Sequence, residues 1–89
     1  MAHIRFTNLF AERIGGISSV DVSAVTVESG LRALTDRYPD LTPLVWAKDG
    51  ALNPVMVLFL NDRQLGAAEI VAPVGPGDEI DIVPALEGG

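Results

Sequence analysis

The sequence predicts an α+β fold, with one main helix on one face of a mixed sheet of four to five strands. Two segments near the start and one near the end alternate apolar with polar residues, which is typical of half-buried strands. An apolar stripe with helical spacing follows the first two, and a continuous apolar run precedes the last. The expected order of strand, strand, helix, strand, short strand, strand indicates a two-layer domain.

The first strand is expected within residues 2–8, where Ile4 and Phe6 alternate with polar neighbours. His3 lies on the polar phase, so we interpret it as a surface residue of the strand and not as a ligand or a base. One histidine and no cysteine cannot supply the four N or S ligands of a structural zinc site. We therefore expect no metal.

The second strand is expected within residues 17–23, where Val20 and Val22 are in phase. Residues 9–14 are expected to be irregular, and Gly15-Gly16 marks a turn. The two strands would form a hairpin, which is only marginally stable in water and needs a cover.

The cover is a helix expected over residues 27–38. Thr26 can cap its N-terminus, and Glu28 in the first turn complements the helix dipole. Gly30 costs of order 1 kcal/mol relative to alanine inside the helix, and Pro39 prevents the helix from continuing. The apolar stripe that would face the sheet consists of Val27, Leu31, Leu34 and Tyr38.

Residues 41–47 are compatible with either a short helical turn or an extended crossover, and the sequence leaves both open. Asp49-Gly50 marks the turn that follows. Trp46, the only tryptophan, is expected to pack across this loop rather than to bind a ligand.

Residues 55–60 are apolar on both alternating phases and are expected to form a central strand. The phase expected to face the helix is Met56, Leu58 and Leu60. The other phase is expected to be a docking face for a partner protein, because an exposed apolar patch on a small domain is usually an interaction site. Its predicted residues are Val55, Val57 and Phe59, extended toward the end of the chain by Val83 and Leu86.

The last strand is expected over residues 79–83, after a brief edge strand at 63–65 and an irregular segment at 66–74 that has room for one short turn. Its two isoleucines point inward, and its acidic side chains are interpreted as a solvated face. Pro84 has no N–H to donate and is expected to end the ladder.

The right-handed crossover rule lets the first and last strands lie side by side in the centre of the sheet. With one helix on one face, this arrangement is a β-grasp roll. We divide the chain into a β-grasp domain, residues 1–84, and a flexible C-terminal tail, residues 85–89. Five extended residues reach at most about 17 Å, which is enough to enter the active site of another protein.

The tail ends on Gly88-Gly89, preceded by Leu86 and Glu87. Because glycine has no Cβ, such a segment can pass a channel too narrow for side chains. The Gly89 carboxylate would be its reactive group. The competing interpretation is a frayed terminus with no role, since chain ends are commonly disordered.

The composition excludes several classes of function. Hydrophobic residues make up 48% of the chain and charged residues 20%, which fits one folded domain and not a disordered chain. The absence of cysteine excludes disulfides, iron–sulfur ligation and a thiolate nucleophile, and it fits the reducing cytoplasm in which we expect the protein. No apolar run approaches the ~20 residues of a membrane span. A net charge of −6 disfavours nucleic-acid binding and suits a basic docking face on a partner.

Four segments can be compared with known families: Thr26-Val27 with Leu31, Leu34 and Arg37-Tyr38-Pro39; Val57–Asp62; Gly77–Ile80 with Ile82–Ala85; and Gly88-Gly89. Together, in this order, they resemble the small sulfur-carrier proteins of the ubiquitin-like superfamily over nearly the whole chain. These carriers include the molybdopterin synthase small subunit, the thiamine-pathway sulfur carrier and the carrier of an alternative cysteine synthase. Residues 46–53 are most similar to the last type, whereas residues 66–74 depart from the family pattern.

The resemblance implies a ubiquitin-like fold and a protein co-substrate that is not itself an enzyme. An adenylating enzyme of the ubiquitin-activating type would activate the Gly89 carboxylate with ATP, and a sulfur source would displace AMP to leave a thiocarboxylate. The carrier would then dock on a sulfur-accepting synthase of molybdopterin, thiamine, cysteine or sulfur-containing metabolite synthesis. No cofactor is expected to be bound, because ATP is used by the activating partner.

Two other functions stay open. A covalent modifier would use the same Gly89 acyl-adenylate to form an isopeptide bond with a lysine. A plain β-grasp binding module would be unaffected by removal of Gly88 and Gly89. An enzyme is the least supported interpretation, because Asp78, Glu79 and Asp81 are interpreted as a solvated row.

Overall fold

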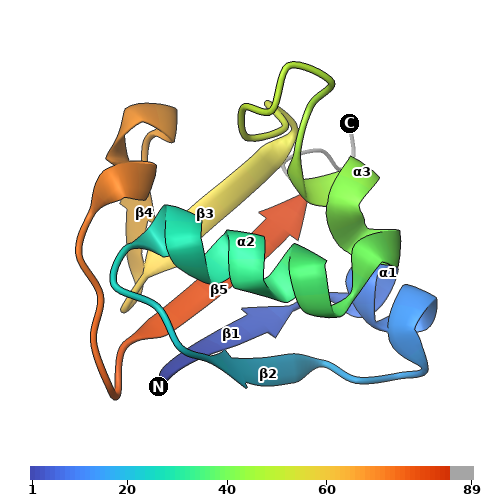
Figure 1. The fold of residues 1–89 in the computed structure, drawn as a ribbon, viewed down its shortest axis with the longest axis horizontal. Helices are drawn as coiled ribbons and strands as arrows, with labels where there is room; N and C mark the ends of the chain where they lie inside the picture. The colour runs from blue at the N-terminus through green and yellow to red at the C-terminus, as the bar shows by residue number, and fades with distance from the viewer. Residues whose placement is uncertain (85–89) are drawn as a thin grey trace.

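The fold of residues 1–84 is described by a computed structural model (Figure 1). Five strands form one mixed sheet in the order β2-β1-β5-β3-β4, and helix α2 (Val27–Arg37) crosses one of its faces. This arrangement confirms the predicted α+β, β-grasp fold. The strands are β1 (Ala2–Phe6), β2 (Ser19–Val22), β3 (Met56–Leu60), β4 (Arg63–Leu65) and β5 (Glu79–Pro84).

The centre of the sheet is the parallel pair β1 and β5, as predicted. Their register runs from His3 opposite Glu79 to Phe6 opposite Ile82. The flanking pairs β1–β2, β5–β3 and β3–β4 are all antiparallel. The first and last strands of the described chain are therefore bonded to each other, and each also has a second neighbour.

The hydrophobic core lies between α2 and the sheet. Gly30 of α2 belongs to this contact, because a Cβ placed on it would lie 3.3 Å from Ala24 Cβ and 3.5 Å from Ile80 Cδ1. The glycine that costs helix propensity thus lets the helix approach the sheet closely. The fully buried side chains include Ile4, Ile80 and Ile82 from the sheet and Val27, Leu31 and Leu34 from the helix.

Both ends of α2 follow the sequence expectation. Thr26 Oγ1 accepts a hydrogen bond from the Ser29 N–H, at 3.1 Å, and Ser29 Oγ accepts one from the Thr26 N–H, at 3.0 Å. This reciprocal pair is a capping box. At the other end, Tyr38 leaves the helical region before Pro39, with φ −128° and ψ 81°.

The interpretation of residues 9–14 as irregular was wrong. They continue the short helix α1 (Asn8–Ala11) into the 3₁₀ turn η1 (Glu12–Ile14), and β1 ends at Phe6. The helix is explained by Phe10, which is fully buried and stacks on Phe6 with a centroid distance of 5.7 Å. Tertiary burial, and not local periodicity, stabilises this turn.

For residues 41–47 the sequence allowed a short helical turn or an extended crossover, and the structure shows the helical turn. A 3₁₀ turn η2 (Pro39–Leu41) leads into the helix α3 (Thr42–Val45), and Trp46 follows. Trp46 is buried, and its Nε1 donates to Thr35 Oγ1 of α2 at 3.1 Å. The prediction that Trp46 packs across the loop holds for its backbone, which pairs with Leu52, whereas its side chain packs against α2.

The remaining differences are small. Residues 67–71 form the 3₁₀ helix η3 (Ala67–Val71), which is longer than the single turn expected there. Pro84, which was expected to end the ladder, is the last residue of β5 and lies opposite Met56, so the strand is one residue longer than the predicted 79–83. In an antiparallel ladder every second pair exchanges no hydrogen bonds, and the facing Met56 N–H donates to the Asn53 carbonyl at 2.9 Å, so this pair does not need the N–H that proline lacks.

Candidate functional site

The candidate site is built on β5, the strand that leads into the predicted reactive tail. β5 lies between β1 and β3, and its pairing with β3 extends to Val83 opposite Val57 and Pro84 opposite Met56. The backbone is therefore held by the sheet up to Pro84. The predicted tail residues Leu86, Glu87, Gly88 and Gly89 lie outside the described residues.

The start of β5 is fixed by a compact set of hydrogen bonds. Asn61 Nδ2 donates to Asp78 Oδ1 at 3.0 Å, and the Glu79 N–H donates to Asn61 Oδ1 at 2.9 Å. The Gly75 N–H donates to Asp78 Oδ2 at 2.8 Å. The Asn61 amide first and the Gly75 N–H second hold the pKa of the Asp78 carboxyl below its ordinary value. The turn after β3 is thereby tied to the strand that carries the tail.

The outer face of the sheet, away from α2, is apolar near the end of β5. Val57 and Val83 lie directly opposite each other, and both are half-buried, as is Phe59. The expected phase of this strand is confirmed, because Met56 and Leu58 are buried in the core.

Val55 lies just before β3, with 47% of its surface exposed. The fold thus brings Val57, Phe59 and Val83 onto one face and leaves Val55 in the turn that precedes it. That these residues bind a partner stays a prediction.

Further along the same face is an ion pair that the sequence interpretation missed. Arg5 donates from Nε to Asp81 Oδ1 at 2.7 Å and from its terminal nitrogen to Asp81 Oδ2 at 2.9 Å, and Glu79 lies 3.4 Å away. The hydrogen bond and charge of Asp81 raise the pKa of Arg5. Asp81 also lies opposite Phe59. The acidic row is therefore not simply solvated. The predicted pairing of the first and last strands puts Arg5 and Asp81 on the same face, but the register that sets them opposite each other comes from the structure.

His3 is a surface strand residue, as expected, and its Nδ1 lies 2.8 Å from Asp21 Oδ1. Among residues 1–84, no three His, Asp or Glu side chains are grouped so as to hold a metal ion. None of the helices in this part of the chain is long and apolar enough to cross a membrane. The described outer face thus has an apolar end beside Pro84 and a charged end beyond it.

Comparisons with known proteins identify the family. No protein-family model matches the chain. A protein of Archaeoglobus fulgidus, named as a candidate sulfur carrier, is 31% identical over 75 residues, which span 83% of this chain and 85% of that protein.

Two solved structures are similar in fold. SAMP1 of Haloferax volcanii, the small archaeal modifier protein 1, is 27% identical, with a TM-score of 0.81 over 99% of this chain and 98% of that one. A chain of the BexX/CysO complex of Amycolatopsis orientalis has a TM-score of 0.85 at 22% identity, over 100% of both chains. These likenesses cover the whole sheet with β5 at its centre, and the Archaeoglobus relative extends the likeness to the sequence. The chain belongs to the ubiquitin-like sulfur-carrier family.

Proposed function

We propose that this protein is a sulfur carrier whose Gly89 carboxylate is adenylated, converted to a thiocarboxylate and used to donate sulfur to a biosynthetic enzyme. The observation that supports this most directly is the position of β5. It is paired with β1 up to Ile82 and with β3 up to Pro84, and it leads into the segment that ends on Gly88-Gly89. A central strand gives a short glycine-ended segment a rigid base. Membership of the sulfur-carrier family supports the same function.

The chemistry requires only an accessible carboxylate from the carrier. An oxygen of the Gly89 carboxylate attacks the α-phosphorus of ATP, and pyrophosphate leaves. A sulfide sulfur then attacks the acyl carbon, AMP leaves with the bonding electron pair, and the product is the thiocarboxylate. Adenylation is needed because an oxide ion is a poor leaving group, whereas AMP is a good one. The carrier is thus a co-substrate, and the activating enzyme and the synthase perform catalysis.

The outer sheet face is the proposed docking surface for both partners. Val57 and Val83 lie next to the base of the tail, so a partner that covers them is positioned to receive the tail. Beyond them, Glu79 and Asp81 outnumber Arg5, which favours basic residues on the partner. CysO, the protein named in one of the similar structures, forms a complex with BexX, which supports docking onto a partner protein as a mode of action.

The test is an intact-mass measurement of the purified chain after incubation with a carrier-activating enzyme, ATP and a sulfide source. We expect a gain equal to the exchange of one oxygen for one sulfur, and no gain for a chain that lacks Gly89. The control is the chain without ATP. Pyrophosphate release without any sulfur gain would contradict sulfur transfer while leaving activation intact.

The likeness to SAMP1, which is named as a modifier, favours a second candidate function. A modifier would join its Gly89 acyl group to lysines of other proteins and raise their masses in a lysate supplied with ATP. If removal of Gly88-Gly89 changed neither this result nor the sulfur gain, the plain binding module would be the better description.

A further inference from the structure

A hollow opens on the surface between α3 and the loop that follows it, and it shares no residue with the proposed docking surface. Its volume of about 570 Å³ lies within the roughly 300–1,000 Å³ of sites that hold small ligands, so it can accept a few residues of a peptide. The lining combines apolar walls, groups that can hydrogen-bond to a peptide backbone and one cation; the residues are Thr42, Pro43, Trp46, Ala47, Lys48 and Asn53.

The hollow lies within reach of the tail of the same chain. The Met56 N–H donates to the Asn53 carbonyl at 2.9 Å, which closes a turn of residues 53–56, and Met56 lies opposite Pro84. The ends of such a turn are less than about 7 Å apart and antiparallel partners about 4.5–5.5 Å, so the Cα atoms of Asn53 and Pro84 are at most about 13 Å apart. The five residues after Pro84 span up to about 17 Å when extended. The end of the tail can therefore lie in the hollow.

Lys48 gives the hollow a positive charge that suits the tail. Its side chain is exposed and forms no ion pair with a carboxylate of residues 1–84, whereas three of the five arginines do. The tail carries the side-chain carboxylate of Glu87 and, in the proposed function, the free carboxylate of Gly89. On a chain with a net charge of −6, an unpaired lysine is a favourable place for such a segment.

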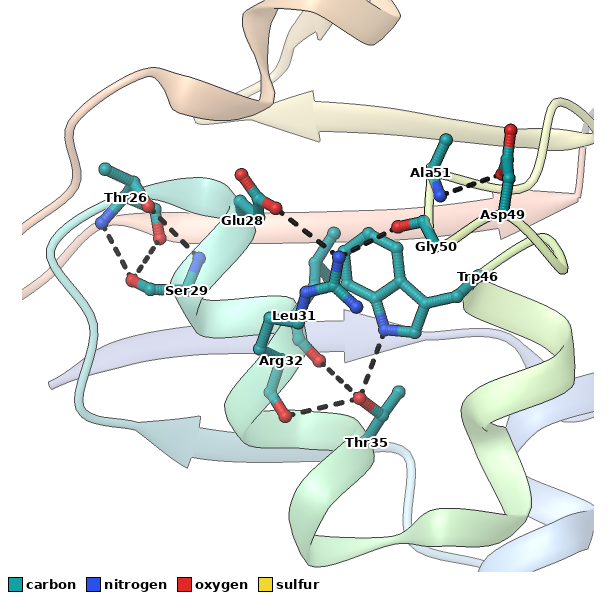
Figure 2. A network of polar contacts seen from close by, with 10 residues as sticks. All are labelled: Thr26, Glu28, Ser29, Leu31, Arg32, Thr35, Trp46, Asp49, Gly50 and Ala51. Carbon is teal, nitrogen blue, oxygen red and sulfur yellow. Dashed lines mark hydrogen bonds and ion pairs between the residues drawn. The ribbon is translucent and has the colours of Figure 1, made fainter.

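The loop that carries Lys48 has a fixed conformation, as Figure 2 shows. The Ala51 N–H donates to Asp49 Oδ1 at 3.0 Å, so the carboxylate next to Lys48 in sequence is used within its own turn. Arg32 of α2 donates to the Gly50 carbonyl at 2.8 Å and ties the turn to the helix. A site that is already ordered loses little further conformational freedom when a segment binds to it.

We propose that this hollow is a resting site for the chain's own tail, in which the Gly89 carboxylate pairs with Lys48 and Glu87 adds to the attraction. Gly88 and Gly89 have no side chains, so their backbone can approach the walls closely. The same chain is favoured over a second copy because a short tether gives an effective concentration in the millimolar range, whereas a second copy loses its overall freedom of movement on binding.

The consequence concerns when Gly89 is available. A partner that binds the outer sheet face meets a carrier whose tail lies in the hollow, and it has to withdraw the tail before the carboxylate can react. The inference takes the free Gly89 carboxylate from the proposed function, but it does not depend on the activation of that carboxylate by ATP.

The test measures the motion of the tail by NMR on the isotope-labelled full chain, without enzyme or ATP. We expect the heteronuclear NOE of the Gly88 and Gly89 amides to be positive in the unchanged chain and to fall to zero or below in Lys48→Glu. Lys48→Arg keeps the charge and should keep most of the NOE. The matched control is Arg63→Glu, which makes the same change of charge at the far end of β3, opposite Leu60, and should leave the tail held.

Dilution separates the same chain from a second copy. Docking within one chain gives the same NOE at every protein concentration, whereas values that fall on dilution would overturn the proposal in favour of a second copy. Added salt should lower the NOE, because exposed charges are screened.

The proposal is also wrong if the tail amides move freely in the unchanged chain, or if Lys48→Glu holds its tail as firmly as the unchanged chain does. Neither result bears on the sulfur-carrier function, because no enzyme takes part. Conversely, a chain that showed tail docking but no pyrophosphate release would lose the proposed function and keep the resting site.

Discussion

Val57 of β3 lies directly opposite Val83 of β5, one residue before the strand ends at Pro84. Both side chains are on the sheet face away from α2, and both are half-buried by their neighbours on that face. The pair lies next to the base of the tail proposed to be reactive, so a partner that binds the pair would also be placed at the tail.

We therefore predict that Val57→Glu weakens binding to the activating enzyme by roughly tenfold to one-hundredfold, because full burial of a valine contributes about 1.5–3 kcal/mol. The measurement is the dependence of pyrophosphate release on carrier concentration. Val71→Glu is the matched control, since Val71 is 65% exposed in η3, outside the docking surface. Equal effects of the two variants would argue against this docking surface.

Most of the sheet was predictable because its strands carry local signals. Ile4, Ile80 and Ile82 alternate with polar residues, and that alternation alone assigns the side chains that face α2. The crossover rule then places the first and last strands together. The helix α1 was not predicted. It has only four residues and depends on the contact of Phe10 with Phe6, which produces no periodic pattern in the sequence.

Only the apolar part of the candidate site was predictable from the sequence. The outward phase of β3 followed from its sequence, and so did the position of Val83 beside it. The ion pair of Arg5 with Asp81 joins residues 76 positions apart and depends on the register of β1 against β5. Sequence alternation gives the face of each side chain, but it does not give that register.

Gly30→Val is predicted to destabilise the fold. The added Cβ would lie 3.3 Å from Ala24 Cβ, and the added side chain would also meet Ile80, which is fully buried. Overpacking of this kind costs about 1–3 kcal/mol, and each kcal/mol lowers the melting temperature of a domain of this size by roughly 4–8 °C. Thermal unfolding checks the prediction, with Gly75→Val as the control, because a Cβ on Gly75 meets nothing within 4 Å. A melting temperature equal to that of the control would show that α2 can move away at no cost.

The hydrogen bonds of Asp78 predict a loss of stability at low pH. Asn61 and Gly75 lower the pKa of this carboxyl in the folded state, so the unfolded chain binds the proton more readily. The stabilisation is complete above the ordinary pKa of an aspartate and is lost as the pH falls through the lowered value. Glu69, whose pKa is lowered by the Gly66 N–H and then by Arg63, acts in the same direction.

Asp78→Asn should therefore reduce the dependence of unfolding free energy on pH below the ordinary pKa, without abolishing it. Denaturant unfolding across that pH range measures the slope. Asp40→Asn is the control, because Asp40 is an exposed aspartate with no side-chain hydrogen bond or ion pair within residues 1–84. Identical slopes for the two variants would mean that the bonds to Asp78 are not maintained in solution.

The contact between Arg32 and Trp46 gives the last prediction. The guanidinium of Arg32 lies 3.7 Å above the Trp46 ring and bonds to the Gly50 carbonyl, so it connects α2 to the loop that carries Lys48. Arg32→Ala should cost about 1–2.5 kcal/mol, since an exposed cation–π contact contributes about 0.5–1 kcal/mol and a hydrogen bond about 0.5–1.5 kcal/mol.

Arg32→Lys should recover only part of this stability, because an ammonium group keeps the charge but lacks the planar fork that can stack and donate at once. The measurements are denaturant unfolding and the near-ultraviolet circular dichroism of the single tryptophan. Arg13→Ala is the control, since Arg13 is exposed and makes no hydrogen bond or ion pair with another described side chain. If Arg32→Lys matched the unchanged protein in both measurements, charge alone would hold the loop. If Arg32→Ala also had the stability and the circular dichroism of the unchanged protein, the conformation of the loop would not depend on its contact with α2.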